Sequence, residues 1–127
     1  MPDLESNKRT VIEFFDLAFN QKRLDEAFDR CVGPTYRQHN PEVADGRDGL
    51  GAFVRQLTTD FPDFSVSIQR VIAEGDLVAA HVFAKRTSDD RGAVSMDMFR
   101  LEDGKLVEHW DVIQEIPETA ANDNGML

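Results

Sequence analysis

The residues best suited to chemistry lie in the last third of the chain, in two apolar segments that also carry ionisable groups. The first segment contains Asp97, and the second contains His109 and Asp111. Asp103-Gly104 lies between them and favours a two-residue type I′ hairpin turn, because both residues tolerate positive φ. An Asp and a His should therefore lie on neighbouring antiparallel strands. Ionisable groups on a half-buried sheet cost free energy unless they are paired or hydrated, so they form either a structural pair or part of a pocket.

Asp97 has the chemistry of a general base. Removing a proton next to a carbonyl group requires a base whose pKa approaches the working pH, and burial among phenylalanines raises a carboxyl pKa. His81, on the preceding predicted strand, could donate a hydrogen bond to the developing enolate oxygen. Strand alternation places His81 and Phe83 on one face of their strand, and Asp97 and Phe99 on one face of the next.

These patterns predict one cavity. We expect Asp97, His81 and His39 to point into it, with Phe15, Phe19, Phe83 and Phe99 as its apolar lining. The alternative for Asp97 and His81 is a purely structural hydrogen bond. His109 and Asp111 either border the same cavity or form a structural pair at the sheet end or at a dimer contact. Trp110 either stacks on a ligand or packs in the core or an interface.

Hydrophobic periodicity predicts helices in the first half of the chain and strands in the second. The first helix should lie between Ser6, as its N-cap, and Asn20, as its stop. The other predicted helices cover residues 24–31 and 48–60, and a strand-like segment that ends in a turn covers 36–41. From Phe64 the apolar period becomes two, which predicts a strand from residue 64 to the turn at 74–76 and further strands over 77–87, 93–101 and 106–116.

Three helices followed by a run of antiparallel strands indicate an α+β domain. We expect a cone-shaped, curved antiparallel sheet with the three N-terminal helices packed on its concave face, which leaves room for a small-molecule pocket. Residues 1–127 should form this one domain, with a polar tail from about residue 118. The outer face of the sheet is expected to carry Val82, Ala84, Trp110 and Val112, and such an apolar face predicts a homodimer.

Composition excludes several classes of partner. The chain has 24 acidic and 14 basic residues and a formal net charge of −10, which argues against a nucleic-acid partner. It has no apolar run long enough to span a bilayer, no basic amphipathic helix and no signal-peptide pattern, so we expect no membrane partner. The single cysteine, Cys31, fits a buried small hydrophobe and a cytoplasmic location.

Four segments resemble motifs of the SnoaL-like polyketide cyclase group of the nuclear transport factor 2-like superfamily. These segments are residues 36–41, 74–78, 97–100 and 104–111. The resemblance implies a nuclear transport factor 2-like or cystatin-like roll, a homodimer and cofactor-free chemistry with an acidic residue as acid/base. By position, Asp97 is similar to that acid/base aspartate, His81 to a pocket histidine and His39 to a polar pocket residue. Phe14 and Phe15 stand where ketosteroid isomerases carry a tyrosine, which argues against steroid-type isomerisation.

The leading functional hypothesis is a cofactor-independent acid/base enzyme, an aldol cyclase or isomerase, that acts on a small hydrophobic carbonyl compound. The second is a non-catalytic domain that binds a small hydrophobic molecule in the same pocket. A metal site could in principle use two histidines and Asp97, but neither an HxH nor an HExxH spacing supports it, and we expect no metal. An interaction module that uses only the outer sheet face is the structural alternative.

Overall fold

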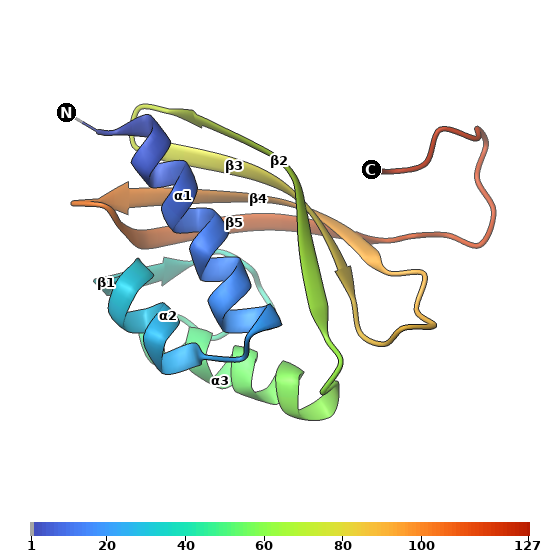
Figure 1. The fold of residues 1–127 in the computed structure, drawn as a ribbon, viewed down its shortest axis with the longest axis horizontal. Helices are drawn as coiled ribbons and strands as arrows, with labels where there is room; N and C mark the ends of the chain where they lie inside the picture. Colours follow the sequence, from blue (N-terminus) through green and yellow to red (C-terminus); the bar gives the residue numbers. More distant parts are fainter. Residues whose placement is uncertain (1) are drawn as a thin grey trace.

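The computed structural model describes residues 2–127 and has an α+β fold (Figure 1). The helical elements are α1 (Leu4–Phe15), the π-helix η1 (Asp16–Asn20), α2 (Leu24–Cys31) and α3 (Gly46–Asp60). The strands are β1 (Val32–Gln38), β2 (Ser65–Glu74), β3 (Leu77–Lys85), β4 (Ala93–Glu102) and β5 (Lys105–Glu115). They form one sheet in the order β1-β5-β4-β3-β2. The predicted α+β class is confirmed, but the sheet is mixed rather than purely antiparallel, because β1 runs parallel to β5.

The helices pack on one face of the sheet, and the sheet bends around them (Figure 1). This inner face presents Val78, Ala80 and Val82 from β3 and Phe99 from β4 to the apolar residues of α1 and η1. Cys31 also lies in this core, and its burial raises the pKa of its thiol to about 11, as expected of an inert core cysteine. None of the helices in the described part of the chain is long and apolar enough to cross a membrane.

The first helix begins earlier than predicted and changes its geometry before it ends. Asp3 is the N-cap, because its side chain accepts a hydrogen bond from the backbone N–H of Ser6 at 3.0 Å, so the prediction of Ser6 as N-cap is wrong. The helix then widens into η1 and ends at Asn20, the predicted stop. The Asn20 amide donates to the carbonyl oxygen of Val66 at 3.0 Å and accepts from its N–H at 2.8 Å, which fixes the end of the helix to β2.

Strand β1 begins directly after α2, at Val32, and so starts earlier than the strand-like segment predicted over 36–41. Pro34 lacks a backbone N–H, which an edge strand tolerates. The pairing of β1 with β5 is irregular between Val32 and Arg37. Gly33 is required for close packing, because a Cβ atom there would lie 2.7 Å from Cγ1 of Val107.

The β4–β5 hairpin turns at Asp103-Gly104, as predicted. Both residues have positive φ, 52° for Asp103 and 76° for Gly104, as a type I′ turn requires. A β-bulge between Arg100 and Leu101 then shifts the register by one residue. Because of this shift, Asp97 pairs with Asp111, so both carboxylates lie on the same face of the sheet.

The outer face of the sheet is exposed and partly apolar. Its exposed apolar side chains are Ile72, Met96, Met98 and Val112. Met98 lies opposite Trp110, and Met96 lies opposite Val112, so the patch is continuous across β4 and β5. Val82 and Ala84 pack in the core instead, so their predicted place on the outer face is wrong.

We propose that a second copy of the chain covers this outer face. Light scattering at micromolar concentration should then give twice the chain mass of 14.3 kDa. Val112→Lys should yield monomers, because it places a charge at the centre of the apolar contact. Leu4→Lys adds the same charge on the exposed side of α1 and should leave the dimer intact. A monomeric wild-type protein would contradict the proposal.

Candidate functional site

The concave side of the sheet holds a small cavity of about 60 Å³. Its apolar lining comes from the helices and β4 and includes Phe14, Phe15, Phe19, Leu50, Phe53 and Phe99. Its polar lining comes from β4, β5 and the end of β1 and consists of Tyr36, Gln38, Asn40, Asp97, His109 and Asp111.

Asp97 and His109 form the centre of the polar lining. Their side chains belong to neighbouring strands, and His109 Nε2 lies 2.8 Å from Asp97 Oδ1. Both residues are buried, with relative exposures of 5% for Asp97 and 7% for His109. Ser95 donates a hydrogen bond to the second carboxylate oxygen of Asp97. The site is therefore a buried carboxylate–imidazole pair beside an aromatic cavity.

Gln38 determines the tautomer of His109. The side-chain oxygen of Gln38 accepts hydrogen bonds from the backbone N–H groups of His39 at 3.0 Å and Asn40 at 2.9 Å. His109 Nδ1 lies 2.8 Å from the same oxygen, so Nδ1 must carry a proton and donate it. One further proton then lies between His109 Nε2 and Asp97. In one state an imidazolium faces a carboxylate, and in the other a neutral imidazole faces a carboxylic acid.

Asp111 and Tyr36 complete the polar side of the cavity. The Asn40 amide donates to both carboxylate oxygens of Asp111, at 2.9 and 3.2 Å. Burial raises the pKa of Asp111, and the negative charge of Asp97 raises it further, although the nearby His109 opposes this shift. Burial and the charges of Asp97 and Asp111 also raise the pKa of the Tyr36 phenol. Tyr36 therefore remains a hydrogen-bond donor at neutral pH.

Side chains of the segment 38–40 contact β5 residues on both faces of the sheet. Gln38 and Asn40 point inward to His109 and Asp111, whereas His39 points outward. His39 Nε2 donates to Glu108 Oε2 at 2.7 Å, and its ring stacks on Trp110 with a centroid distance of 4.9 Å. Hydrogen bonds from His39 and then from Arg100 lower the pKa of Glu108. On the outer face, the contacts of Glu108 with His39 and Arg100 thus hold the segment 38–40 in place. On the inner face, Gln38 of this segment orients His109.

Two of the predicted catalytic residues lie outside the cavity. His39 lies on the outer face, as described above. His81 also points outward, because its neighbour Ala80, not His81, pairs with Asp97. Arg70 can only donate, so its 2.8 Å contact makes His81 Nδ1 an acceptor, and His81 Nε2 donates to the carbonyl oxygen of Met126 at 2.9 Å. The predicted shared cavity for Asp97, His81 and His39 is therefore wrong, and His109 takes the place beside Asp97.

The predicted aromatic lining is correct in part. Phe15, Phe19 and Phe99 line the cavity, and so does His109. Phe83 lies on the outer face, where a Cβ atom at Gly92 would come within 2.5 Å of its ring, and Trp110 stacks on His39. Tyr36, Gln38 and Asn40 were not predicted as site residues. Their alternate spacing, which puts them on one side of an extended segment, is the sequence signal that could have found them.

The potential metal ligands that the structure brings together differ from those considered in the sequence analysis. The described chain has one group of potential metal ligands, Asp97, His109 and Asp111, whose donor atoms all lie within 4.8 Å of one another. His39 and His81 are not part of it. In this arrangement His109 Nε2, the nitrogen a cation would need, is already hydrogen-bonded to Asp97. A cation bound there would have to displace the proton that His109 and Asp97 share.

Asp111→Asn is expected to stabilise the protein at neutral pH. A carboxyl group whose pKa is raised on folding binds more protons in the folded state, so it loses stability as the pH rises from its ordinary value of 3.8 towards the raised value. Asparagine cannot ionise and still accepts from Asn40. Urea unfolding should show the variant more stable than wild type near pH ~7, with a smaller difference near pH ~4.

Asp89→Asn removes the same charge from an exposed position in the β3–β4 loop and serves as the control. Asp89→Asn should not show the pH-dependent increase in stability that is expected of Asp111→Asn. An Asp111→Asn variant that loses stability relative to wild type as the pH rises from about 4 to about 7 would contradict the predicted sign.

Three helices on the concave face of an open, five-stranded mixed sheet define an α+β protein of the nuclear transport factor 2-like class. The model of the SnoaL-like domain matches residues 11–109. The chain therefore belongs to the SnoaL-like family. No curated protein matches the chain.

Solved structures with the same fold include three that align over most of this chain. TsrD from Streptomyces laurentii is 27% identical, with a TM-score of 0.75 over 89% of this chain and 91% of TsrD. A proposed SnoaL-like polyketide cyclase from Jannaschia sp. CCS1 is 21% identical, with a TM-score of 0.74 over 89% of this chain and 88% of that one. A proposed ketosteroid isomerase from Kribbella flavida DSM 17836 is 21% identical, with a TM-score of 0.74 over 94% and 86%. The last two similarities, each at 21% identity, show only that the fold is shared.

Proposed function

We propose that this protein is a cofactor-independent acid/base enzyme that acts on a small hydrophobic carbonyl compound, of the aldol cyclase or isomerase type. The observation that carries the proposal is the buried Asp97–His109 pair, which lines an aromatic cavity and in which Gln38 fixes the tautomer of His109. Two structural relatives are described as a polyketide cyclase and a ketosteroid isomerase. Both names fit chemistry that starts with removal of a proton next to a carbonyl group.

In the proposed reaction Asp97, in its carboxylate state, removes a proton from the carbon next to the carbonyl group. The electron pair of the broken C–H bond moves into an enolate, whose oxygen accepts a hydrogen bond from the Tyr36 phenol. An isomerase returns the proton from Asp97 to a different carbon. A cyclase lets the enolate carbon attack a second carbonyl group of the same molecule, and the resulting alkoxide takes the proton back.

Deuterium exchange tests the proposal even when the product is unidentified. A panel of small ketones is incubated with the protein in deuterated water, and enzyme-dependent deuterium uptake next to the carbonyl group is measured. The rate should not change when a chelator is added, because the reaction uses only protein groups. Absence of exchange in every ketone that raises the melting temperature of the protein would favour the alternative, a non-catalytic small-molecule-binding domain with the same pocket.

A further inference from the structure

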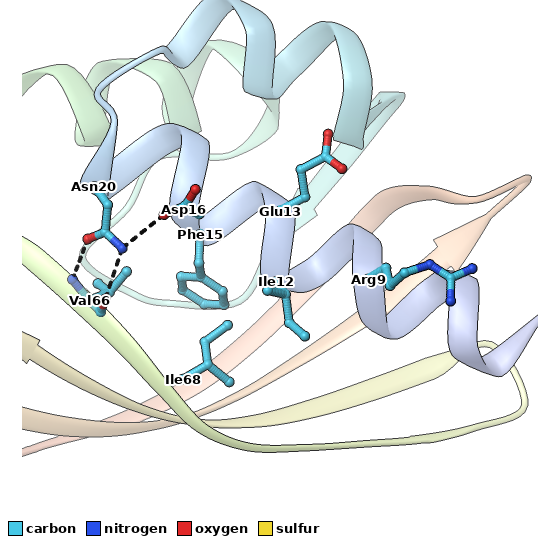
Figure 2. Close-up of a pocket in the computed structure, with 8 residues that line it drawn as sticks. All are labelled: Arg9, Ile12, Glu13, Phe15, Asp16, Asn20, Val66 and Ile68. Atoms are coloured by element: carbon cyan, nitrogen blue, oxygen red, sulfur yellow. Dashed lines mark hydrogen bonds between the residues drawn. The ribbon is translucent and has the colours of Figure 1, made fainter.

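A second space lies next to the inner cavity, between α1 and β2 (Figure 2). This groove has a volume of about 480 Å³ and is open to solvent on one side. Ile12 and Phe15 from α1 and Val66 and Ile68 from β2 form its apolar walls, and Figure 2 shows the side chains of Ile12, Phe15 and Ile68 directed toward one another. The groove is about eight times larger than the inner cavity of about 60 Å³.

Phe15 separates the groove from the inner cavity, because it lines both of them. On the inner side, its ring packs edge-on against Phe99 with a centroid distance of 5.7 Å. The Phe99 ring in turn lies 4.7 Å from the ring of His109. Phe15 thus divides the solvent-exposed groove from the cavity that Asp97 and His109 line. Phe15 is also the last residue of α1 before the π-helix, where the helical hydrogen-bond pattern changes.

Arg9 supplies the free positive charge of the groove. Glu13 is ion-paired with Arg30 at 2.6 Å, and Asp16 accepts from the side chain of Asn20. Among the described residues Arg9 has no ion-pair partner, and Figure 2 shows it at the end of the groove opposite Asn20. The groove therefore combines an apolar floor with one available cation, Arg9, at one end, while the Asp16 carboxylate at the other end is held by the side-chain amides of Asn20 and Gln21.

We infer that the α1–β2 groove binds the distal arm of the substrate, and that Phe15 is the movable wall between this arm and the reacting carbonyl group. The inference rests on the proposed function. It identifies the substrate class as an elongated, mainly apolar carbonyl compound with an anionic end group near Arg9. The inner cavity alone is too small for such a compound, since ligand pockets usually measure ~300–1,000 Å³. Displacement of the Phe15 ring joins the two spaces.

Anilinonaphthalene sulfonate, an apolar aromatic compound with one anionic group, serves as the probe. Its affinity is measured by fluorescence, and its position by the ring-nitrogen NMR signals of isotope-labelled histidine. The three histidines report on different places, because His109 lies in the cavity and His39 and His81 lie on the outer face. We expect the probe to shift the His109 signals and leave the other two unchanged.

Ile12→Trp should fill the groove and weaken probe binding by at least ~tenfold, equivalent to ~1.4 kcal/mol. Leu4→Trp is the matched control, since Leu4 lies on the same helix outside the groove with a relative exposure of 40%, against 42% for Ile12. Arg9→Gln should weaken binding roughly two- to fivefold. Lys8→Gln removes the same charge one residue away, where Lys8 pairs with Glu5, and should have no effect.

Two results would overturn the inference. The first is unchanged affinity in Ile12→Trp, which would place the probe elsewhere. The second is loss of affinity in Ile12→Trp without any shift of the His109 signals by the probe in the wild-type protein, which would show that the groove does not connect to the cavity. Neither result depends on turnover, so failure of the groove and failure of the acid/base activity can be told apart.

Discussion

Asp97→Asn is expected to slow deuterium exchange into a substrate ketone by at least ~100-fold, because general acid–base catalysis typically contributes ~10²–10⁴-fold. The substitution removes the base but keeps the shape of the site. The asparagine amide can donate to His109 Nε2, and its oxygen can accept from Ser95, so both hydrogen-bond partners of Asp97 stay satisfied. Exchange rates and urea unfolding of the same preparation separate a loss of catalysis from a loss of structure.

His81→Asn is the control for this prediction. His81 matches a pocket histidine by sequence resemblance, but its ring contacts Arg70 and Met126 on the outer face. We expect its exchange rate to equal that of the wild type. If Asp97→Asn exchanges at the wild-type rate while His81→Asn is slow, the assignment of the inner pair is wrong.

Phe99→Ala is expected to lower the free energy of unfolding by about 3–5 kcal/mol, the usual cost of removing a buried phenylalanine ring. Phe99 has a relative exposure of 1% and packs edge-on against Phe14 and Phe15 at centroid distances of 6.1 and 5.7 Å. The cost is a large part of the total stability of a small domain, ~5–15 kcal/mol. Urea unfolding with a constant m-value measures it.

Phe83→Ala provides the comparison on the opposite face of the sheet. Strand alternation predicts both rings inside one cavity, but Phe83 lies outside it and is only partly buried. Phe83→Ala should lower the free energy of unfolding clearly less than Phe99→Ala does. Equal losses for the two variants would contradict the assignment of Phe83 to the outer face of β3.

The order of the elements could be predicted because it rests on local patterns. The predicted limits of the second helix, residues 24–31, match α2, and the predicted turn at Asp103-Gly104 has the φ angles its residues favour. The strand-like segment predicted over 36–41 overlaps only the end of β1, because Gly33-Pro34 indicates a stop when only neighbours in sequence are considered. Its partner β5 lies more than sixty residues further along the chain, since Val32 pairs with Leu106. No local pattern encodes that pairing.

The site residues could be predicted only where the sequence also determines how the neighbouring strands pair. The two-residue turn predicted that Asp97 and His109 lie on neighbouring strands, but it left open whether His109 borders the cavity. The β-bulge at Arg100 and Leu101, which sets them on one face, leaves no clear mark in the sequence. The longer loop between β3 and β4 does not fix a register, and both faces of β3 carry apolar residues, so His81 was placed on the wrong side.

The Asn20–Val66 contact has a consequence for self-association. An open sheet has two free edges, and an unprotected edge can pair with a strand of another molecule and start aggregation. On β2, the Asn20 side chain already occupies the N–H and the carbonyl oxygen of Val66 that an incoming strand would need. On β1, at the opposite edge, Pro34 offers no N–H to such a strand. At these two positions the edges therefore resist pairing with a strand of another molecule.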